Sequence, residues 1–468
     1  SNLINKMEFF IVPEGNETDF LKINSPQEIK ICDPACGSGH MLTYSFDLLY
    51  IIYEEEGYDL NSIPKLILEN NLYGIELDQR AGALAAFSLA IKARGKQTNF
   101  FNNFIQPNIC ILENIKFESD ELNEYREIVG NDLFTSSLET TLLQFANTKN
   151  FGSLIKPSLN NIDRILEQFK LKNFSTDLLL DLTHKKVLKA IKQAKYLDNR
   201  YHIVVANPPY LGVKGMNPEL SKFAKDVFPD SKSDLFSMFV ERSISLVCES
   251  GYLSCLTMQS WMFLASYSNF RRMIYEKNQL IQVFHTGPGL FPDLGSFNVL
   301  TTTFLIKICN NDNKKNCLFI KGNESPNIED KIESLRDHKK YIQIDLSIFN
   351  SIPGKPLIYW LSLNALRSFA RRNLIKDICP PKQGMATTNN SLFVRNWQEI
   401  SLTKISFDSK SEMNAVLSQK KWFPYNKGGD YRKWYGNNEY VVNYENSGKT
   451  ICDYKITVLK HHTWRKYR

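Results

Sequence analysis

The sequence lacks the features that would place the chain in or across a membrane. It contains no run of about 18 apolar residues, the length that a membrane-spanning helix requires. Its start, SNLINKMEFF, has no basic stretch followed by an apolar one, so we expect no signal peptide and a cytoplasmic location. The start also lacks an initiator methionine, and we expect the chain to be an internal piece of a longer protein.

Cysteine pairs of the kind that hold metals are missing as well. Nine cysteines are scattered along the chain without a C-x-x-C pair, and no histidines lie beside them at zinc-ligand spacing. An odd number of cysteines in apolar stretches is typical of buried thiols in a reducing compartment. We therefore expect no metal site.

Acidic residues are scarce in the last quarter of the chain. The whole chain has 57 Lys and Arg against 50 Asp and Glu, a net charge of +7. Residues 351–468 hold 20 basic and 8 acidic residues (+12), which leaves 37 basic and 42 acidic residues (−5) in the rest. This division is typical of a catalytic body followed by a module that binds a polyanion, although a basic surface without a partner would look the same.

Strand-like and helical segments alternate in the first 120 residues and again after residue 200, which predicts βαβ units and a mostly parallel sheet with helices on both faces. Between them, about 117–200 carry helical periodicity alone and predict a helical insertion. We expect domains at 1–350 and 351–468, the second of mixed α/β character and cut short. The expected strands lie within 29–39, 72–77, 109–112, 203–206, 252–257, 280–286, 298–308 and 317–322, the last two as a hairpin, and the expected helices are 41–57, 79–95, 160–172, 176–197, 234–251 and 260–277.

The first chemical motif is 33-DPACGSGH-40, where a strand delivers Asp33 into a glycine turn that opens a helix. No lysine follows Gly39, which excludes a phosphate-binding P-loop. Glycines allow a ligand to approach the backbone closely, and the acid favours a cationic ligand with an amino-acid tail. S-adenosyl-L-methionine is such a ligand, whereas a simple strand-to-helix turn is the alternative.

The second motif is Glu76, at the end of the next expected strand in 74-GIELD-78. A carboxylate in this position can accept hydrogen bonds from both hydroxyl groups of a ribose, as it does in dinucleotide-binding folds. Taken alone, Glu76 would be an ordinary exposed acid. Together with the glycine loop it favours a nucleoside ligand.

The third motif is Asn207-Pro208-Pro209-Tyr210, which ends the strand in 203-IVVANPPYLG-212. The exocyclic amine of adenine is a poor nucleophile because its lone pair is delocalised into the ring. The Asn207 side-chain oxygen and the Pro208 carbonyl could each accept one of its N–H groups, held rigid by the prolines. Tyr210 would stack on a base that has been flipped out of the duplex. A proline-rich turn without chemistry is the alternative.

These motifs resemble those of the amino-methyltransferases that modify adenine at N6, and more closely those of the PglX methyltransferases of BREX phage-defence systems. The segments that carry the resemblance are CDPACGSGHMLTYSFDLLY, NNLYGIELDQRAGALAAFSLAIKAR, VVANPPYLG and PYNKGGDYRKWYGNNEYVVNYEN. It implies a Rossmann-like class I methyltransferase domain, a helical insertion, and the start of a target-recognition domain for double-stranded DNA. It also implies other BREX proteins as partners.

The resemblance assigns roles to individual residues. It implies cofactor contacts by Asp33, Pro34, Ala35, Gly37, Gly39, Glu76 and Leu77, and adenine contacts by Asn207, Pro208, Pro209 and Tyr210. Phe291 is the candidate for a second aromatic wall, or else a residue that caps the core. Where the family usually has Asp-Ser after the third strand, this chain has Glu113-Asn114, the expected substitutes. No aromatic lid is recognisable before Ser25, so we expect weak cofactor binding.

The C-terminal part supplies the candidates for DNA binding. Arg and Lys can contact phosphates or guanine, and Asn can contact adenine. The candidate residues are Arg395, Lys427, Arg432 and Lys433, whereas we expect Trp434 and Tyr435 to be packing residues.

Other functions stay open at this point. The chain could be the modification part of a type IIG restriction enzyme, which would need an endonuclease centre elsewhere. Related N-P-P-Y enzymes methylate glutamine in proteins or bases in RNA, but they are typically shorter and lack a large basic domain. A DNA-recognition scaffold without activity of its own is the non-enzymatic alternative.

Overall fold

The computed structural model describes residues 2–7, 21–103, 105–130, 132–175, 177–291, 299–309, 316–369, 375–380 and 384–465. The chain forms two compact units, Ser1–Arg372 and Asn373–Arg468. The division lies later than the expected boundary at 350. The reason is that Leu357, Tyr359 and Leu366 are buried in the hydrophobic core of the first unit.

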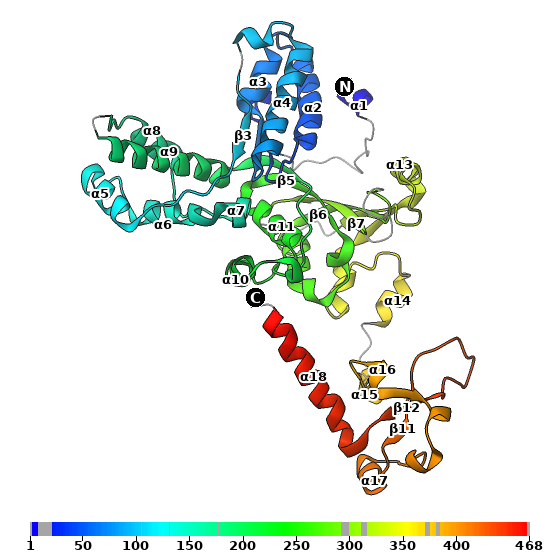
Figure 1. Cartoon of the computed structure of the whole chain (residues 1–468). Helices are drawn as coiled ribbons and strands as arrows, with labels where there is room; N and C mark the ends of the chain where they lie inside the picture. The colour runs from blue at the N-terminus through cyan, green and yellow to red at the C-terminus, as the bar shows by residue number, and fades with distance from the viewer. Residues whose placement is uncertain are drawn as a thin grey trace. The chain divides into compact units, whose positions relative to one another are not determined.

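The first unit is built on a nine-stranded sheet with the order β3-β2-β1-β4-β5-β7-β6-β8-β9 (Figure 1). The strands from β3 to β5 run parallel, and β7 is antiparallel to both of its neighbours, β5 and β6. This order confirms the predicted Rossmann-like α/β fold. The strands are β1 (Ile31–Asp33), β2 (Leu72–Glu76), β3 (Asn108–Ile111), β4 (Tyr201–Ala206), β5 (Val247–Met258), β6 (Gln279–Gly287), β7 (Thr301–Lys307), β8 (Asn316–Lys321) and β9 (Tyr341–Asp345).

Helices cover both faces of the sheet, because successive residues of a strand point to opposite sides. Ile31 of β1 belongs to one hydrophobic core, and the next residue, Cys32, belongs to another. The first core is completed by α2 (His40–Glu55), α3 (Ile63–Asn70) and α4 (Gln79–Lys96). On the other face lie α9 (Leu178–Asp198), α11 (Leu235–Leu246) and α12 (Ser268–Tyr275).

The hairpin expected from the last two strands of the sheet is wrong. β7 pairs along one edge with β5 and along the other with β6, so neither of its edges is left for β8. Instead β8 pairs in parallel with β6, and β9 extends the sheet antiparallel to β8. Of the residues expected at the turn, 310–316, only Asn316 lies in the described part of the chain.

The helix expected over 260–277 is shorter than predicted. Two 3-10 turns, η6 (Gln259–Met262) and η7 (Ala265–Tyr267), come first, and only α12 is an α-helix. The fully buried guanidinium of Arg271 donates to the carbonyl oxygens of Trp261 at 2.6 Å and Leu264 at 2.7 Å. These contacts connect the residues of the 3-10 turns to α12.

The region expected as a helical insertion contains α5 (Ser119–Val129), α6 (Ser136–Gln144), α7 (Thr148–Phe151), η4 (Gly152–Leu154), α8 (Ile162–Lys170) and α9. Its apolar residues, such as Tyr125 and Phe169, belong to the same core as the sheet residue Val204. Two further helices of this unit are α10 (Pro218–Val227) and α13 (Ile328–Arg336), and the short helices α1 (Asn2–Lys6) and α14 (Leu363–Ser368) lie near its ends in sequence.

Arg242 connects α11 to the insertion and is 4% exposed. Its guanidinium donates to the carbonyl oxygens of Ser153, Ile155 and Leu197. We expect Arg242→Met to lower the free energy of unfolding by roughly 3 kcal/mol, because these buried acceptors lose their donor. Urea denaturation measures the change, with the exposed Arg272→Met as control. A loss no larger than that of the control would contradict the prediction.

The second unit contains a small antiparallel sheet with the order β10-β12-β11. Its strands are β10 (Val394–Asn396), β11 (Trp422–Pro424) and β12 (Tyr440–Asn443), and its helices are α15 (Ile375–Ile378), α16 (Asn390–Phe393), α17 (Glu412–Leu417) and α18 (Glu445–Arg465). Residues 446–448 within α18 have positive φ angles, so the regular helix begins after them. Among the described residues of both units, no helix combines the length and apolar character that spanning a bilayer requires.

Candidate active site

Three of the predicted site residues lie on neighbouring strands at one edge of the sheet. Asp33 ends β1, Glu76 ends β2, and Asn207 directly follows β4. β1 pairs in parallel with both β2 and β4, so the carboxyl ends of these strands are adjacent, about 4.8 Å from strand to strand. β1 is also the point at which the strand order reverses, where open α/β sheets bind their ligands.

The glycine loop after β1 is a tight turn closed by a hydrogen bond from Gly39 N–H to the Cys36 carbonyl at 2.8 Å. Gly37 and Gly39 have φ angles of +52° and +84°, which side chains rarely adopt. A Cβ atom at Gly39 would lie 3.0 Å from Cβ of Ala85, whereas one at Gly37 would have nothing within 4 Å. Gly39 thus allows α4 to pack closely, and Gly37 faces open space.

The Glu76 side chain lies beside the glycine loop and holds it in place by accepting backbone hydrogen bonds. Its Oε2 accepts the Gly37 N–H at 2.8 Å, and its Oε1 accepts the N–H groups of Leu77 at 2.8 Å and Asp78 at 2.9 Å. A carboxylate offers about four acceptor positions, so these three donors leave one for a ligand.

Asp33 is 2% exposed and its Oδ1 accepts the N–H of Ala35 at 3.0 Å. Burial raises the pKa of Asp33 to about 7; the Ala35 N–H opposes this shift, and the negative charge of Glu76 adds to it. A carboxyl group with a pKa near neutrality ionises readily when a positive charge approaches it.

Sequence reasoning missed the part of the insertion that contacts the glycine loop. The Lys149 side chain donates to the Leu77 carbonyl, and Ser153 Oγ donates to the Pro34 carbonyl. Gly152 has a φ of +55°, and a Cβ there would lie 3.0 Å from Leu77 Cδ1. The only sign of this arrangement in the sequence is Gly152, because the contacts join residues far apart in the chain.

Glu113 and Asn114, which stand after β3 where the family usually has Asp-Ser, form hydrogen bonds with different residues. Lys189 of α9 donates to Glu113 Oε2 at 2.6 Å, which holds that carboxylate against the insertion. Asn114 Oδ1 accepts the backbone N–H of Lys149 at 2.7 Å. Because Lys149 also contacts the Leu77 carbonyl, Asn114 is linked to the glycine-loop region.

The N-P-P-Y turn leaves Asn207 open to solvent. Asn207 and Pro209 are exposed and Pro208 is buried. Within the described residues, the Pro208 carbonyl accepts no hydrogen bond. The Tyr210 hydroxyl lies 3.2 Å from Asn207 Oδ1 and 3.3 Å from the Leu256 carbonyl, so its single proton is shared between two acceptors. The half-buried position of Tyr210 raises the pKa of its hydroxyl, which stays protonated.

A half-buried carboxylate, that of Asp234, holds this turn against α11. Asp234 Oδ1 accepts the N–H of Leu211 at 3.0 Å and that of Phe236 at 3.2 Å. The Tyr210 ring then meets Phe236 edge to face, with ring centroids 6.2 Å apart. Asp234 is therefore a positioning residue for the N-P-P-Y turn.

Two expectations fall wholly or partly outside the described residues. Phe291 lies just after β6 and is half-buried, but the rest of its segment, 292–298, is not described. Residues 8–20, where an aromatic lid was not recognised, are also not described.

The candidate DNA-binding residues all lie in the second unit. Arg395 donates to the carbonyl oxygens of Ser391 and Val394 and so is engaged within its own unit. Lys427 lies over the ring of Tyr440, 4.7 Å from its centroid. The candidate residues Arg432 and Lys433 lie in the exposed loop between β11 and β12.

Trp434 and Tyr435 are not the packing residues that we expected. They are 88% and 87% exposed. The segment between β11 and β12 is too polar and glycine-rich to fold back over them, so their rings stay in solvent.

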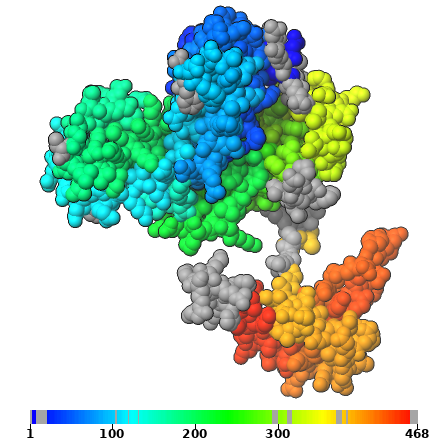
Figure 2. Space-filling model, turned by 45° about the horizontal axis from the view of Figure 1, so that its top comes forward, coloured from blue at the N-terminus to red at the C-terminus, as the bar shows by residue number. Residues whose placement is uncertain are grey.

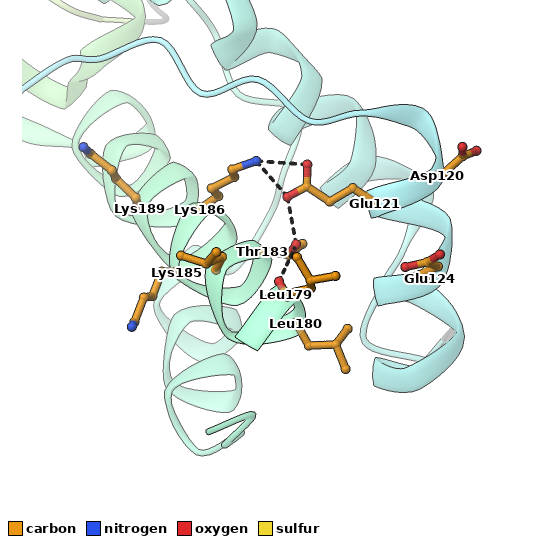
Figure 3. Close-up of a pocket in the computed structure, with 10 residues that line it drawn as sticks. Asp120, Glu121, Glu124, Leu179, Leu180, Thr183, Lys185, Lys186 and Lys189 are labelled. Atoms are coloured by element: carbon orange, nitrogen blue, oxygen red, sulfur yellow. Dashed lines mark hydrogen bonds and ion pairs between the residues drawn. The ribbon is translucent and has the colours of Figure 1, made fainter. Parts of the chain in front are cut away.

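A pocket of about 600 Å³ lies away from the site, between α5 and α9 (Figure 3). Lys186 donates to both carboxylate oxygens of Glu121, at 2.8 and 3.0 Å, and Thr183 donates to one of them at 2.8 Å. None of the predicted site residues lines this pocket, and its main ionic contact is internal to the insertion.

Comparison with known proteins finds adenine-specific methyltransferases that match almost the whole chain. A family model described as Eco57I restriction-modification methylase matches residues 70–291. Adenine-specific methyltransferase BrxX of Escherichia coli O9:H4 (strain HS) is 35% identical over 96% of this chain, and adenine-specific methyltransferase PglX of Lacticaseibacillus casei (strain Zhang) is 31% identical over 97%. The chain spans 39% of the length of each.

A solved structure of the Type ISP restriction-modification enzyme LlaGI with a DNA substrate mimic is 15% identical and covers 73% of this chain and 25% of its own, with a TM-score of 0.45. The sequence relationship to BrxX and PglX runs through both units and includes every predicted site residue between Asp33 and Lys433 in its span. The chain therefore belongs to the BrxX/PglX family.

Proposed function

We propose that the chain is the catalytic part of a DNA methyltransferase that transfers a methyl group from S-adenosyl-L-methionine to N6 of a flipped-out adenine. Its role would be to mark host DNA in a BREX phage-defence system. The observation that carries the proposal is the meeting of Asp33, Glu76 and Asn207 on three adjacent parallel strands. The names of the relatives, adenine-specific methyltransferases, support the same reaction.

The residues at the ends of β1 and β2 fit the cofactor chemically. S-adenosyl-L-methionine carries a positive sulfonium and a positive ammonium group, and the two carboxylates here have no cationic side chain as a hydrogen-bonded partner among the described residues. The open space at Gly37 allows a ligand to reach the backbone. We assign the cofactor to Asp33, Glu76 and the loop 34–39, with Leu77 and Asn114 beside it. When bound, the cofactor supplies the electrophilic methyl group.

The N-P-P-Y turn would hold the adenine. Asn207 Oδ1 and the Pro208 carbonyl each accept one N–H of the exocyclic amine, which returns its lone pair to the nitrogen. The Tyr210 ring stacks on the base and, through its hydroxyl, orients the Asn207 amide. Phe291 is the proposed second wall.

We propose that the second unit binds the DNA duplex, with Lys427, Arg432, Lys433 and, more weakly, Arg395 as contacts. Their positive charges lie on a unit with few acidic residues. Other proteins of the defence system are the proposed partners of the full-length protein, of which this chain is about two fifths.

The direct test is transfer of label from methyl-labelled S-adenosyl-L-methionine to duplex DNA, followed by identification of N6-methyladenine after hydrolysis. Label in N6-methyladenine would support the proposal. No transfer by the chain or by the full-length protein, even with its partner proteins, would favour a scaffold without activity. Label in RNA or protein alone would point to another N-P-P-Y substrate.

We expect Tyr210→Phe to lower kcat about tenfold while KM for DNA stays the same. The ring still stacks, but the Asn207 amide loses the hydroxyl that orients it. Tyr210→Ala should lower kcat further and raise KM for DNA, because stacking is lost as well. Steady-state kinetics of the two variants checks this. Equal loss in both would show that the ring contributes nothing.

Binding of DNA should weaken steeply with salt, because each phosphate contact releases counterions. We expect the double variant Lys427→Gln/Arg432→Gln to reduce the slope of log K against log salt by about 0.9 for each contact removed. Fluorescence anisotropy of labelled duplex at several salt concentrations measures the slope. A response that does not depend on salt, or an unchanged slope in the variant, would contradict the assignment.

A further inference from the structure

The loop between β11 and β12, residues 425–439 and here called the aromatic loop, carries three aromatic side chains in solvent. Tyr431, Trp434 and Tyr435 are 85%, 88% and 87% exposed. In Figure 2 this dark-orange segment projects from the second unit as a finger. Large exposed apolar groups that gather in one place mark binding sites more often than chance exposure does.

Contacts between its two arms hold the aromatic loop together. The Asn437 side chain donates to the Asp430 carbonyl at 3.2 Å, and a Cβ at Gly429 would lie 2.8 Å from Asn437 Oδ1. Likewise, a Cβ at Gly436 would lie 2.6 Å from Cγ of Arg432. The two sides of the loop contact each other at glycines. The aromatic rings lie in solvent and not between the two sides.

A hollow of about 410 Å³ lies beside the rings of Trp434 and Tyr435 and is lined by groups that suit a nucleobase. Trp434 and Tyr435 offer aromatic faces on which a base can stack. Asn426 and Asn438 offer amides that can pair with a base edge, and within the described residues these amides have no hydrogen-bond partner. Lys427 completes the lining with a positive charge.

The charge around the hollow favours a nucleic acid over an apolar protein surface. Residues 427–435 hold three basic side chains and one acidic one. Lys433 lies over the Trp434 ring, 5.5 Å from its centroid, so a cation accompanies the exposed aromatic face. The second unit as a whole, 373–468, has 16 basic and 8 acidic residues. A polyanion with unstacked bases matches both the rings and the charge.

We propose that the aromatic loop binds an unstacked base of the DNA, with the base stacked on Trp434 or Tyr435 and its edge toward Asn426 and Asn438. Arg432 and Lys433 contact the phosphates on either side. This inference rests on the proposed function, because turning an adenine out of the duplex leaves unpaired bases that such a loop can hold.

The test uses the 468-residue chain and a short duplex that carries 2-aminopurine in a single-base bulge. Stacking on an indole or phenol ring quenches 2-aminopurine, so binding of the wild type should lower its fluorescence. We expect the double variant Trp434→Ala/Tyr435→Ala to bind the bulged duplex about tenfold more weakly and to leave it unquenched at saturation. The two proteins should bind the fully paired duplex with similar affinity.

Three control variants separate stacking from charge and from folding. Phe407 is an aromatic residue of the same unit that is 55% exposed and lies outside the loop, so Phe407→Ala should behave as wild type. Lys433→Gln should weaken binding to both duplexes and keep the quenching at saturation. Trp434→Phe should retain most of the affinity for the bulged duplex, because a ring remains. Thermal denaturation confirms that each variant is folded.

The outcomes separate this inference from the proposed function. A double variant that binds and quenches like Phe407→Ala would overturn the inference, and the loop would then be a contact for another protein or for the rest of the polypeptide. Absence of binding to either duplex by the wild type would overturn it as well. If the wild type quenches 2-aminopurine but neither binds S-adenosyl-L-methionine nor transfers its methyl group, the proposed function falls and the base-binding loop stands.

Discussion

Replacing Asn207 by alanine should reduce methyl transfer to DNA by about 10²–10³-fold, the loss that follows removal of one preorganised polar group from a catalytic site. The Asn207 side chain is exposed at the end of β4, with its oxygen in reach of the Tyr210 hydroxyl. It therefore contributes little to folding. Without it the Pro208 carbonyl is the remaining acceptor for the adenine amine, whose lone pair stays delocalised into the ring.

Two measurements and a control variant distinguish this loss from a loss of binding. Single-turnover transfer from labelled cofactor gives the rate of the chemical step, and calorimetric titration of S-adenosyl-L-methionine should be unchanged in Asn207→Ala. Asn102→Ala is a suitable control, because Asn102 is exposed in the turn η2 (Phe100–Asn103), away from the motif in sequence. Methylation by Asn207→Ala at the wild-type rate would refute the catalytic assignment of the N-P-P-Y turn.

The fold around this site could be predicted from the sequence where the signal is local. Asp33, Glu76 and Asn207 each directly follow a short β-branched or apolar stretch. A few consecutive residues are therefore enough to place them at strand ends. The glycines at 37 and 39 likewise indicate a turn whose backbone needs positive φ angles at these two positions. The parallel order of the first five strands followed from the helices between them.

What could not be predicted depends on contacts between distant parts of the chain. The pairing of β8 with β6 rather than β7 is decided by β7 lying between β5 and β6, and the sequence of β7 alone does not reveal this. Ser153 reaches Pro34 across 119 positions of sequence, so no local pattern marks it. Trp434 is another example, because burial of an aromatic residue depends on what folds over it.

The ionised carboxylate of Asp33 can attract a cation to this site. Because the group is buried, however, its ionisation lowers the stability of the fold. Burial keeps the pKa of Asp33 at about 7, well above its ordinary value of 3.8. The folded state therefore holds the proton more tightly than the unfolded state does. The stability that Asp33 contributes is fully present below about pH 3.8 and is lost as the pH rises through about 7.

Asp33→Asn should therefore make the chain more stable at pH 8 and no more stable at pH 4. The difference between 3.8 and about 7 corresponds to roughly 4 kcal/mol at most, and about half of that should remain after the new amide N–H₂ group is buried. The asparagine oxygen can still accept the Ala35 N–H, so the loop keeps its shape. Denaturation at the two pH values measures the change, with the exposed Asp59→Asn as control.

The same variant should bind S-adenosyl-L-methionine about tenfold to a hundredfold more weakly at pH 8, since an ionised Asp33 attracts the positive groups of the cofactor. In the wild type, affinity should rise with pH through about 7, and binding near pH 6.5 should release a proton as Asp33 ionises. Calorimetry in buffers of different ionisation enthalpy counts that proton. A variant that is less stable than wild type at pH 8 would contradict the stability prediction. A variant that binds the cofactor equally well would show that Asp33 has no part in holding the cation.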